Sequence, residues 1–369
     1  MSADTYPLEA VPPPEGRVDE RVLTLPFECL RSLPEGINEV HVWSDPLLGC
    51  ERVGKRIDMS AMEGDDVLPE PATLQSIRHN NVVPVVAAAE VSGYPQPMRV
   101  VEVITPYFER GSITDALLRG EKFTARTAVA ITQATLRGLS EVHEVHGICH
   151  RDVKSGNVLL CPDHVARLAD LGLCGRFDDN GEVLALKNPT LYSSPEFTAT
   201  STLTRASDVY SVGLILRELL GGPFPYADYT TTFVLERMSA GRSPLRAADL
   251  SLPIWASRSM RRVYTKATHR DPARRYQSAH EMDQALSRVV AVDWEQISEN
   301  RWEAPFVHSS KRVAVEATWM PRKKLFRVSS LASTKSGWRR TQDDVEVDDL
   351  GSTAVARVFN HASDTANAR

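Results

Sequence analysis

The 369-residue sequence has few cysteines, no long apolar run and no large excess of either charge. Its five cysteines are an odd number and form no C-x-x-C pair, which argues against a disulfide framework and against a zinc site. No segment approaches the roughly 18 apolar residues of a transmembrane helix, and the N-terminus lacks the basic and apolar regions of a signal peptide. We therefore expect an intracellular, cytoplasmic protein without a transmembrane segment, with access to the nucleus left open.

The overall charge gives no basic field that would favour a nucleic-acid partner. The net charge is -5 at pH 7, and 42% hydrophobic and 25% charged residues are ordinary for a soluble globular protein. The length leaves room for a two-lobed enzyme of about 250 to 300 residues with additional segments. We therefore expect no nucleic-acid partner, and composition names no other partner.

The most informative stretch is HRDVKSGN at residues 150–157, followed by DLG at residues 170–172. Asp152 is a carboxylate positioned to accept a proton. Asn157 and Asp170 are oxygen ligands on separate segments, as Mg²⁺ bound to nucleotide phosphates requires. A charged surface loop is the plain alternative, but it does not account for the fixed spacing over eight residues and the second Asp-x-Gly motif.

This spacing resembles the catalytic loop and the metal-binding motif of eukaryotic-type protein kinases. The resemblance implies that Asp152 is the catalytic base and that Lys154 neutralises the transferred γ-phosphate. It also implies two metal ligands, Asn157 and Asp170, and ATP and Mg²⁺ as cofactors. The implied fold is α+β and bilobal, with a small β-rich lobe that carries helix C and a large, mostly helical lobe.

The resemblance also predicts how the chain is divided into domains. Residues 1–20 combine prolines with acidic and small residues, and we expect a disordered leader there. The kinase domain is expected over residues 21–293, with its small lobe at 21–105 and its large lobe at 109–293.

Residues 294–369 show no core period, so we expect a mostly disordered tail whose partners the sequence does not name. An alternative is that its basic clusters form a membrane-binding or partner-binding motif together with Trp319, Phe326 and Trp338.

By resemblance, a glycine-rich hairpin covers the phosphates, with Gly36 and Val40 in plausible places. Pro34 stands where the first glycine usually lies, and the third glycine is missing. Glycine lets backbone N–H groups approach phosphate oxygens closely, so this degenerate loop is expected to hold nucleotide less tightly. A second hypothesis therefore stays open, namely a pseudokinase that acts as a binding or scaffolding module with weak or no phosphotransfer.

The segment VGK at residues 53–55 resembles the strand whose lysine holds the α- and β-phosphates. By resemblance, Lys55 is that lysine and Val53 stacks on the adenine. Glu70 would be the helix C glutamate that pairs with Lys55, and Glu63 is a weaker substitute. Two prolines flank Glu70 and place it at the start of its helix, so it could instead only interact with the helix dipole.

Residues 105–112 resemble a kinase gatekeeper and hinge. Thr105 would be a small gatekeeper. The expected adenine contacts are the carbonyl of Pro106 and the N–H and carbonyl of Phe108, and proline lacks only a donor that this role does not use. Leu159 completes the expected nucleotide-binding residues.

Two further features of the sequence resemble kinase large lobes. Glu196, in a Ser-Pro-Glu motif, should form a buried ion pair with Arg275, and Asp208 should hold the backbone of the catalytic loop. Residues 171–187 contain no serine, threonine or tyrosine. We hypothesise that an acidic residue of this segment supplies the anion that phosphate supplies elsewhere. The candidates are Asp178, Asp179 and Glu182.

The expected substrates are proteins with serine or threonine hydroxyls, because Lys154 fits that class of kinase. Pro189 looks more like the tyrosine-specific pattern, so tyrosine specificity stays an alternative. A small-molecule phosphotransferase on the same fold is a third, remoter reading.

Overall fold

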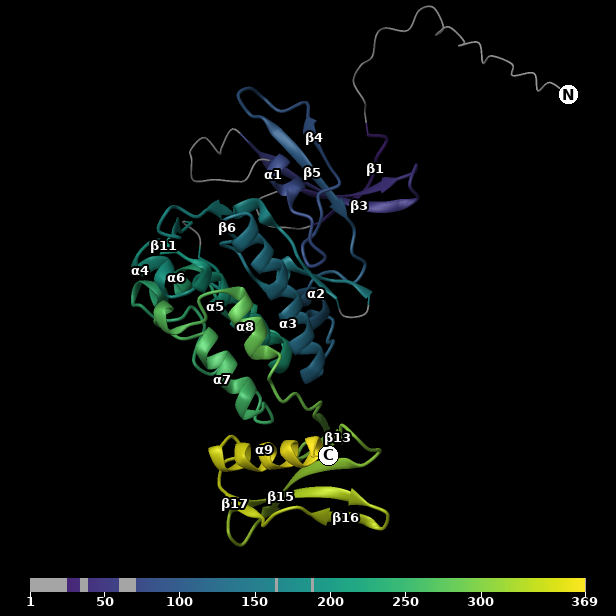
Figure 1. The fold of residues 1–369 in the computed structure, drawn as a ribbon, viewed down its shortest axis with the longest axis vertical. Helices are drawn as coiled ribbons and strands as arrows, with labels where there is room; N and C mark the ends of the chain where they lie inside the picture. The colour runs from purple at the N-terminus through teal and green to yellow at the C-terminus, as the bar shows by residue number, and fades with distance from the viewer. Residues whose placement is uncertain (1–24, 34–38, 60–70, 163–164, 187–188, 369) are drawn as a thin grey trace, which may run out of the picture.

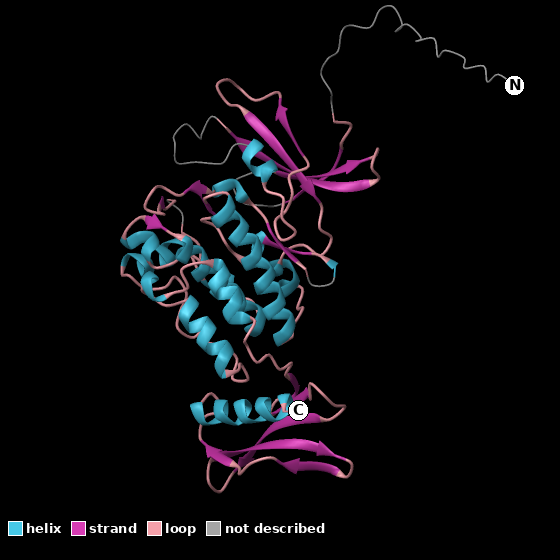
Figure 2. Cartoon of the chain, viewed as in Figure 1, coloured by secondary structure: helices cyan, strands magenta, loops and turns pink. Residues whose placement is uncertain are grey.

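The computed structural model describes residues 25–33, 39–59, 71–162, 165–186 and 189–368. Within these ranges the chain forms a small β-rich lobe, a larger helical lobe and a C-terminal sheet with one long helix (Figures 1 and 2). The expectations for the leader at 1–20 and for Gly36, Glu63 and Glu70 concern residues outside the described ones.

The small lobe is a five-stranded antiparallel sheet with the strand order β1-β2-β3-β5-β4. Its strands are β1 (Glu28–Leu33), β2 (Val40–Asp45), β3 (Cys50–Asp58), β4 (Ala87–Val91) and β5 (Val100–Pro106). Strand β5 is rich in β-branched residues, which suit a pleated surface that is buried on both sides. The short helix α1 (Pro71–Ser76) lies beside this sheet (Figure 1).

The large lobe is built around helix α5, which is buried along almost its whole length. The helices are α2 (Ile113–Leu118), α3 (Ala125–Ser140), α4 (Glu196–Ala199), α5 (Arg205–Gly221), α6 (Thr231–Ser239), α7 (Arg258–Ala267) and α8 (Ala279–Leu286). Several begin at a serine or threonine whose side chain accepts a backbone N–H of the first turn, including Ser112, Thr124 and Ser278.

Short two-stranded ladders hold the loops that carry the predicted catalytic motif. They pair β6 (Ile148–Cys149) with β9 (Gly175–Arg176), β7 (Val158–Leu160) with β8 (Ala166–Leu168), and β10 (Val183–Leu184) with β11 (Thr202–Leu203). Residues 150–157 therefore lie between β6 and β7, and residues 170–172 lie between β8 and β9. Both motifs are fixed at each end by backbone pairing.

The expectation of a mostly disordered tail over residues 294–369 is wrong, because this segment folds as a sheet with a helix. The sheet has the strand order β12-β13-β14-β15-β16, and β17 also pairs with β15. Its elements are β12 (Glu295–Ser298), β13 (Arg301–Pro305), β14 (Arg312–Met320), β15 (Leu325–Thr334), β16 (Gly337–Arg340), β17 (Val345–Val347) and α9 (Thr353–Asn367).

One face of this C-terminal sheet is apolar and α9 covers it. Val313, Val315 and Ala317 alternate along β14 and are buried against an apolar stripe of α9 that includes Phe359. Trp319 packs on Phe326 with ring centroids 4.8 Å apart, within the same sheet. The helix that covers the apolar face comes last in the sequence, which explains why no core period is apparent within the strands alone.

The C-terminal sheet and helix also contact the large lobe. Ile254, Trp255 and Val290 of the large lobe pack against the apolar cluster under α9. The backbone N–H of Arg258 donates to the side-chain oxygen of Asn360 at 2.8 Å. Among the described helices, none has both the length and the apolar character that crossing a membrane requires.

Candidate active site

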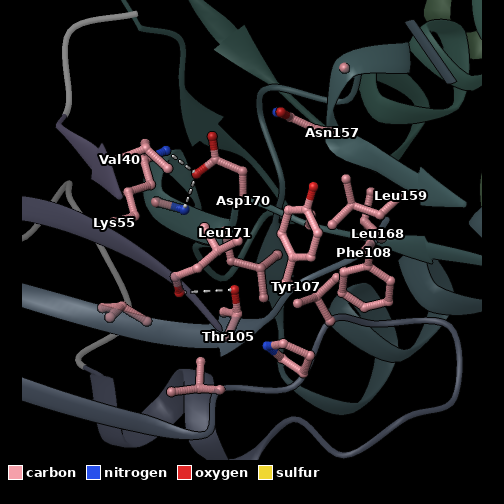
Figure 3. A pocket seen from close by; sticks show the side chains of 18 of the residues that line it. Val40, Lys55, Thr105, Tyr107, Phe108, Asn157, Leu159, Leu168, Asp170 and Leu171 are labelled. Carbon is pink, nitrogen blue, oxygen red and sulfur yellow. Dashed lines mark hydrogen bonds and ion pairs between the residues drawn. The ribbon is translucent and has the colours of Figure 1, made fainter. Parts of the chain in front are cut away.

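A cleft between the small lobe and the large lobe is lined by residues from both (Figure 3). Nine residues of the predicted nucleotide site line this one cleft. They are Val40, Val53, Lys55, Thr105, Pro106, Phe108, Asn157, Leu159 and Asp170. The lining also includes Tyr107 and Leu168, which the sequence reading did not select. Most of the wall is apolar, and the polar groups converge at one end of it.

Lys55 and Asp170 meet at this polar end. The side-chain nitrogen of Lys55 lies 2.6 Å from Oδ1 of Asp170, and the same oxygen accepts the N–H of Gly172 (Figure 3). Burial opposes ionisation of Asp170, but the nearby Lys55 outweighs it and lowers the pKa of that carboxyl. Asp170 has φ 58° and ψ 66°, a left-handed conformation that aims its carboxylate into the cleft.

Asp152, Lys154 and Asn157 form a hydrogen-bonded group on the catalytic loop. Lys154 Nζ lies 2.7 Å from Oδ2 of Asp152, and the amide nitrogen of Asn157 donates to the same oxygen at 3.0 Å. It also donates to the Asp152 carbonyl at 2.9 Å. This arrangement leaves Oδ1 of Asp152 and the amide oxygen of Asn157 free of hydrogen-bond partners among the described residues.

Asp208 of helix α5 holds the backbone of the catalytic loop. Its carboxylate accepts the N–H of His150 at 2.8 Å and that of Arg151 at 3.1 Å. His143 adds a third contact through Nε2 at 2.8 Å. Burial of Asp208 raises its pKa, but the contact with His143 outweighs this and the net effect is a lowered pKa. A carboxylate kept ionised in the core thus fixes the loop on which Asp152 stands.

Arg151 connects the catalytic loop to the segment that follows Asp170. Its guanidinium donates to the carbonyls of Leu173 at 2.6 Å, Cys174 at 2.6 Å and Leu184 at 3.0 Å. Asp178, one candidate for an anion that pairs with Arg151, instead accepts two backbone N–H groups of its own turn, both at 2.9 Å. These three hydrogen bonds of Arg151 therefore go to backbone carbonyls and not to Asp178.

The ion pair expected between Glu196 and Arg275 is present. It is bidentate, with nitrogen–oxygen distances of 2.6 and 2.7 Å, and Ser207 donates to the same carboxylate at 2.8 Å. The Arg275 side chain has no exposed surface. Glu196 begins helix α4 and Arg275 follows the turn at residues 272–274, so the pair fixes the end of the activation segment to the large lobe.

A buried polar cluster next to the catalytic loop was missed by sequence reasoning. Ser155 lies directly after Lys154, and its hydroxyl lies 2.6 Å from both the Thr114 hydroxyl and the Tyr192 hydroxyl. Tyr192 in turn donates to Glu218 of helix α5. Burial raises the pKa of Glu218 despite these hydrogen bonds. The hydroxyl at Ser155 was visible in the motif, but its partners lie far away in sequence.

Two lobes with an apolar cleft between them, and a lysine of one lobe facing a carboxylate of the other, are the arrangement by which proteins of the kinase type hold nucleotide and metal. The model of the protein kinase domain matches residues 49–287, and the chain belongs to the protein kinase family. The predicted family and the predicted α+β bilobal fold are thereby confirmed. The match ends before the C-terminal sheet.

Curated relatives resemble this chain over its kinase region. Serine/threonine-protein kinase STE20 of Eremothecium gossypii is 29% identical over 51% of this chain and 19% of its own length. Serine/threonine-protein kinase 12 of Arabidopsis thaliana is 26% identical over 68% and 54%. Serine/threonine-protein kinase PknB of Mycolicibacterium smegmatis is 29% identical over 60% and 35%. Each match therefore spans less than two thirds of the relative.

Proposed function

We propose that this protein is an active protein kinase that uses Mg²⁺ and transfers the γ-phosphate of ATP to serine or threonine hydroxyls of proteins. The observation that carries the proposal is the convergence of Lys55 and Asp170 in the cleft, beside a catalytic loop that presents Asp152 and Asn157. The three relatives described above are serine/threonine kinases by name, which supports the choice of hydroxyl.

The donor set fits a magnesium ion. Among the described residues nothing donates to the amide oxygen of Asn157, and Oδ2 of Asp170 is not used by Lys55. Hard oxygen ligands in small number, completed by phosphate and water, are what Mg²⁺ takes in such sites. When bound, the ion would neutralise charge on the β- and γ-phosphate oxygens.

The remaining side chains each have a role in positioning or proton transfer. Lys55 extends from β3 toward the phosphates. Oδ2 of Asp152 is held by Lys154 and Asn157, which orients Oδ1 to accept the hydrogen of an incoming hydroxyl. Lys154 Nζ lies next to Oδ2 of Asp152, where a fixed positive charge stabilises the transferred phosphoryl group.

The apolar part of the cleft suits an adenine ring. Val53 and Leu159 line it, and Thr105 donates to the Val53 carbonyl at 3.4 Å, which keeps the gatekeeper hydroxyl paired. The Phe108 carbonyl already accepts the N–H of Gly111 at 2.9 Å, whereas the Phe108 N–H has no partner among the described residues. We expect this N–H to be the main hinge donor to the base.

A pseudokinase is the second candidate. It is favoured by the degenerate glycine-rich loop, where Pro34 stands in place of the first glycine and the third glycine is missing. A binding module of this kind would use the same cleft without transferring phosphate.

Calorimetry with Mg·ATP and a phosphotransfer assay separate the two candidates. An active kinase should bind Mg·ATP and label itself or a peptide library, and Asp152→Asn should retain binding but lose labelling. Phosphoamino-acid analysis should show phosphoserine or phosphothreonine. Binding without any labelling of the unmodified protein would support the pseudokinase, and exclusive phosphotyrosine would refute the proposed specificity.

A further inference from the structure

Three arginines at the junction of the large lobe and the C-terminal helix form no ion pair with other described residues. Arg258 and Arg262 lie on α7 and Arg357 lies on α9, and Figure 1 shows one end of α7 next to α9. All three are exposed, and none forms an ion pair within the described ranges of the chain. Since the whole chain carries a net charge of -5, this local excess of positive charge stands out.

These arginines line a cavity between α7 and α9. Asn360 and Ser363 supply side-chain hydrogen-bonding groups to its lining, and Val290 supplies an apolar patch. Asp364 is the one carboxylate among the described lining residues. The cavity lies away from the nucleotide cleft, and the two linings share no residue.

A second, shallower groove continues from the cavity along α7. Arg258 and Arg262 belong to both linings, so the two are contiguous. The groove adds Lys266 and Arg274, which are exposed. Arg261 also lines it, but its guanidinium is already used by three backbone carbonyls of residues 253–256. Lys266 Nζ also lies 4.2 Å from the centre of the Tyr276 ring. The exposed cations thus follow an extended path rather than one point.

We propose that this cationic groove docks a phosphorylated, acidic segment of a partner protein. Arginine guanidinium groups bind phosphate oxygens with two parallel hydrogen bonds, and an arginine cluster is a recurring means of recognising phosphorylated peptides. The elongated path suits an extended peptide. The chain's net charge of -5 disfavours a long polyanion such as nucleic acid, whose charge would extend beyond the groove.

This inference goes beyond the proposed function and does not depend on phosphotransfer. Docking outside the cleft would hold partners that are already phosphorylated, by this protein or by another kinase. Such a site raises the effective concentration of neighbouring hydroxyls at the cleft.

Fluorescence anisotropy with the full chain tests the proposal. The probe is a labelled peptide with two phosphoserines among glutamate and glycine residues, and its unphosphorylated form is the matched probe. We expect Arg262→Glu and Arg357→Glu each to weaken binding of the phosphorylated probe by about tenfold or more. Asp364→Asn should strengthen binding, because it removes the opposing carboxylate.

Arg322→Glu is the matched control, since it makes the same charge change at an exposed arginine outside both linings. Equal effects of Arg262→Glu and Arg322→Glu would overturn the site, and equal binding of both probes would overturn the phosphate requirement. Displacement of the peptide by vesicles of anionic lipid, with the same arginine dependence, would overturn the protein partner. Repeating the titration with Asp152→Asn separates this result from the proposed activity, because binding should be unchanged.

Discussion

The ion pair between Glu196 and Arg275 provides a quantitative test of how the large lobe is stabilised. The Arg275 side chain is fully buried, and two nitrogen–oxygen contacts of 2.6 and 2.7 Å join it to Glu196. Its remaining donors reach the carbonyls of Ala206, His269 and Arg270. If Glu196 loses its charge, the guanidinium stays buried without a counterion.

Glu196→Gln should therefore be strongly destabilising. Breaking a buried pair by neutralising one partner costs about 3 to 5 kcal/mol. For a lobe of this size, each kcal/mol corresponds to a melting shift of about 2 to 4 °C, so we expect a fall of roughly 6 to 20 °C. Differential scanning calorimetry and chemical denaturation measure both quantities.

The matched control is Glu144→Gln, which removes an exposed partner of Arg205 that lies 3.2 Å away. Pairs of this kind contribute at most about 1 kcal/mol, so the control should melt close to the unmodified protein. Replacing both members of the buried pair by Leu and Met should recover much of the loss, because no uncompensated charge remains. Equal melting shifts for Glu196→Gln and the control would refute the reasoning.

The same pair sets a pH dependence. Burial of Glu196 opposes its ionisation, but the hydrogen bonds and charge of Arg275 outweigh it and lower the pKa of the carboxyl. A carboxyl with a lowered pKa in the folded state contributes stability above the pKa of a free glutamate, about 4.3. That contribution is lost as pH falls through the lower folded-state value. The stability difference between the unmodified protein and Glu196→Gln should therefore shrink as the pH falls below about 4.

Three other predictions concern the burial or the contacts of one residue each. Cys149 is buried, and burial raises the pKa of its thiol well above the usual value, whereas Cys29 is exposed. Of these two cysteines, maleimide should therefore label only Cys29 in the native protein, as peptide mass spectrometry would show. Arg151→Ala removes the donors to three backbone carbonyls and should speed limited proteolysis between residues 171 and 186, and an unchanged cleavage rate would contradict this. Phe359→Ala should lower the free energy of unfolding of the C-terminal sheet by about 3 to 5 kcal/mol in denaturant titrations. The Phe359 ring is buried and makes edge contacts with Trp294 and Trp302.

The part of the site that the residues themselves indicated most directly is one short loop, and the roles of its residues and of the other cleft residues came from the resemblance to kinases. Asp152, Lys154 and Asn157 belong to one loop, so their spacing alone determines which groups can meet. Contacts over longer distances, such as Asp208 with the loop backbone, were expected only through the resemblance to kinases. The structure then supplied their geometry.

Contacts to backbone atoms leave little trace in a sequence. The carbonyls that Arg151 binds are present in every residue, so nothing in the side chains of residues 173, 174 and 184 marks them as partners. The hypothesis that Asp178, Asp179 or Glu182 supplies an anion in this segment considered side chains only, and for Asp179 and Glu182 it stays a prediction. The contacts of Ser155 were hidden for another reason, because its hydroxyl partners, Thr114 and Tyr192, come from two distant segments.

The C-terminal sheet shows a different limit. The alternation of Val313, Val315 and Ala317 is a strand pattern, but it covers one strand, and the positions between and beside these residues mix Ala314 with charged Arg312 and Glu316. The pattern gains meaning only when α9 covers it, since a single-layer sheet cannot bury an apolar face alone. A prediction made segment by segment therefore favours disorder.

The kinase core and the C-terminal sheet are physically continuous. Trp255 packs against the apolar cluster of the large lobe and also against the cluster under α9. Helix α7 begins two residues after the buried Ala256, packs on α5 and contacts α9 through the Arg258 backbone. Helix α5 carries Asp208, which holds the catalytic loop. The cationic groove and the catalytic loop are thus attached to the same packed helices, so a segment bound along α7 is held at a fixed place relative to the cleft.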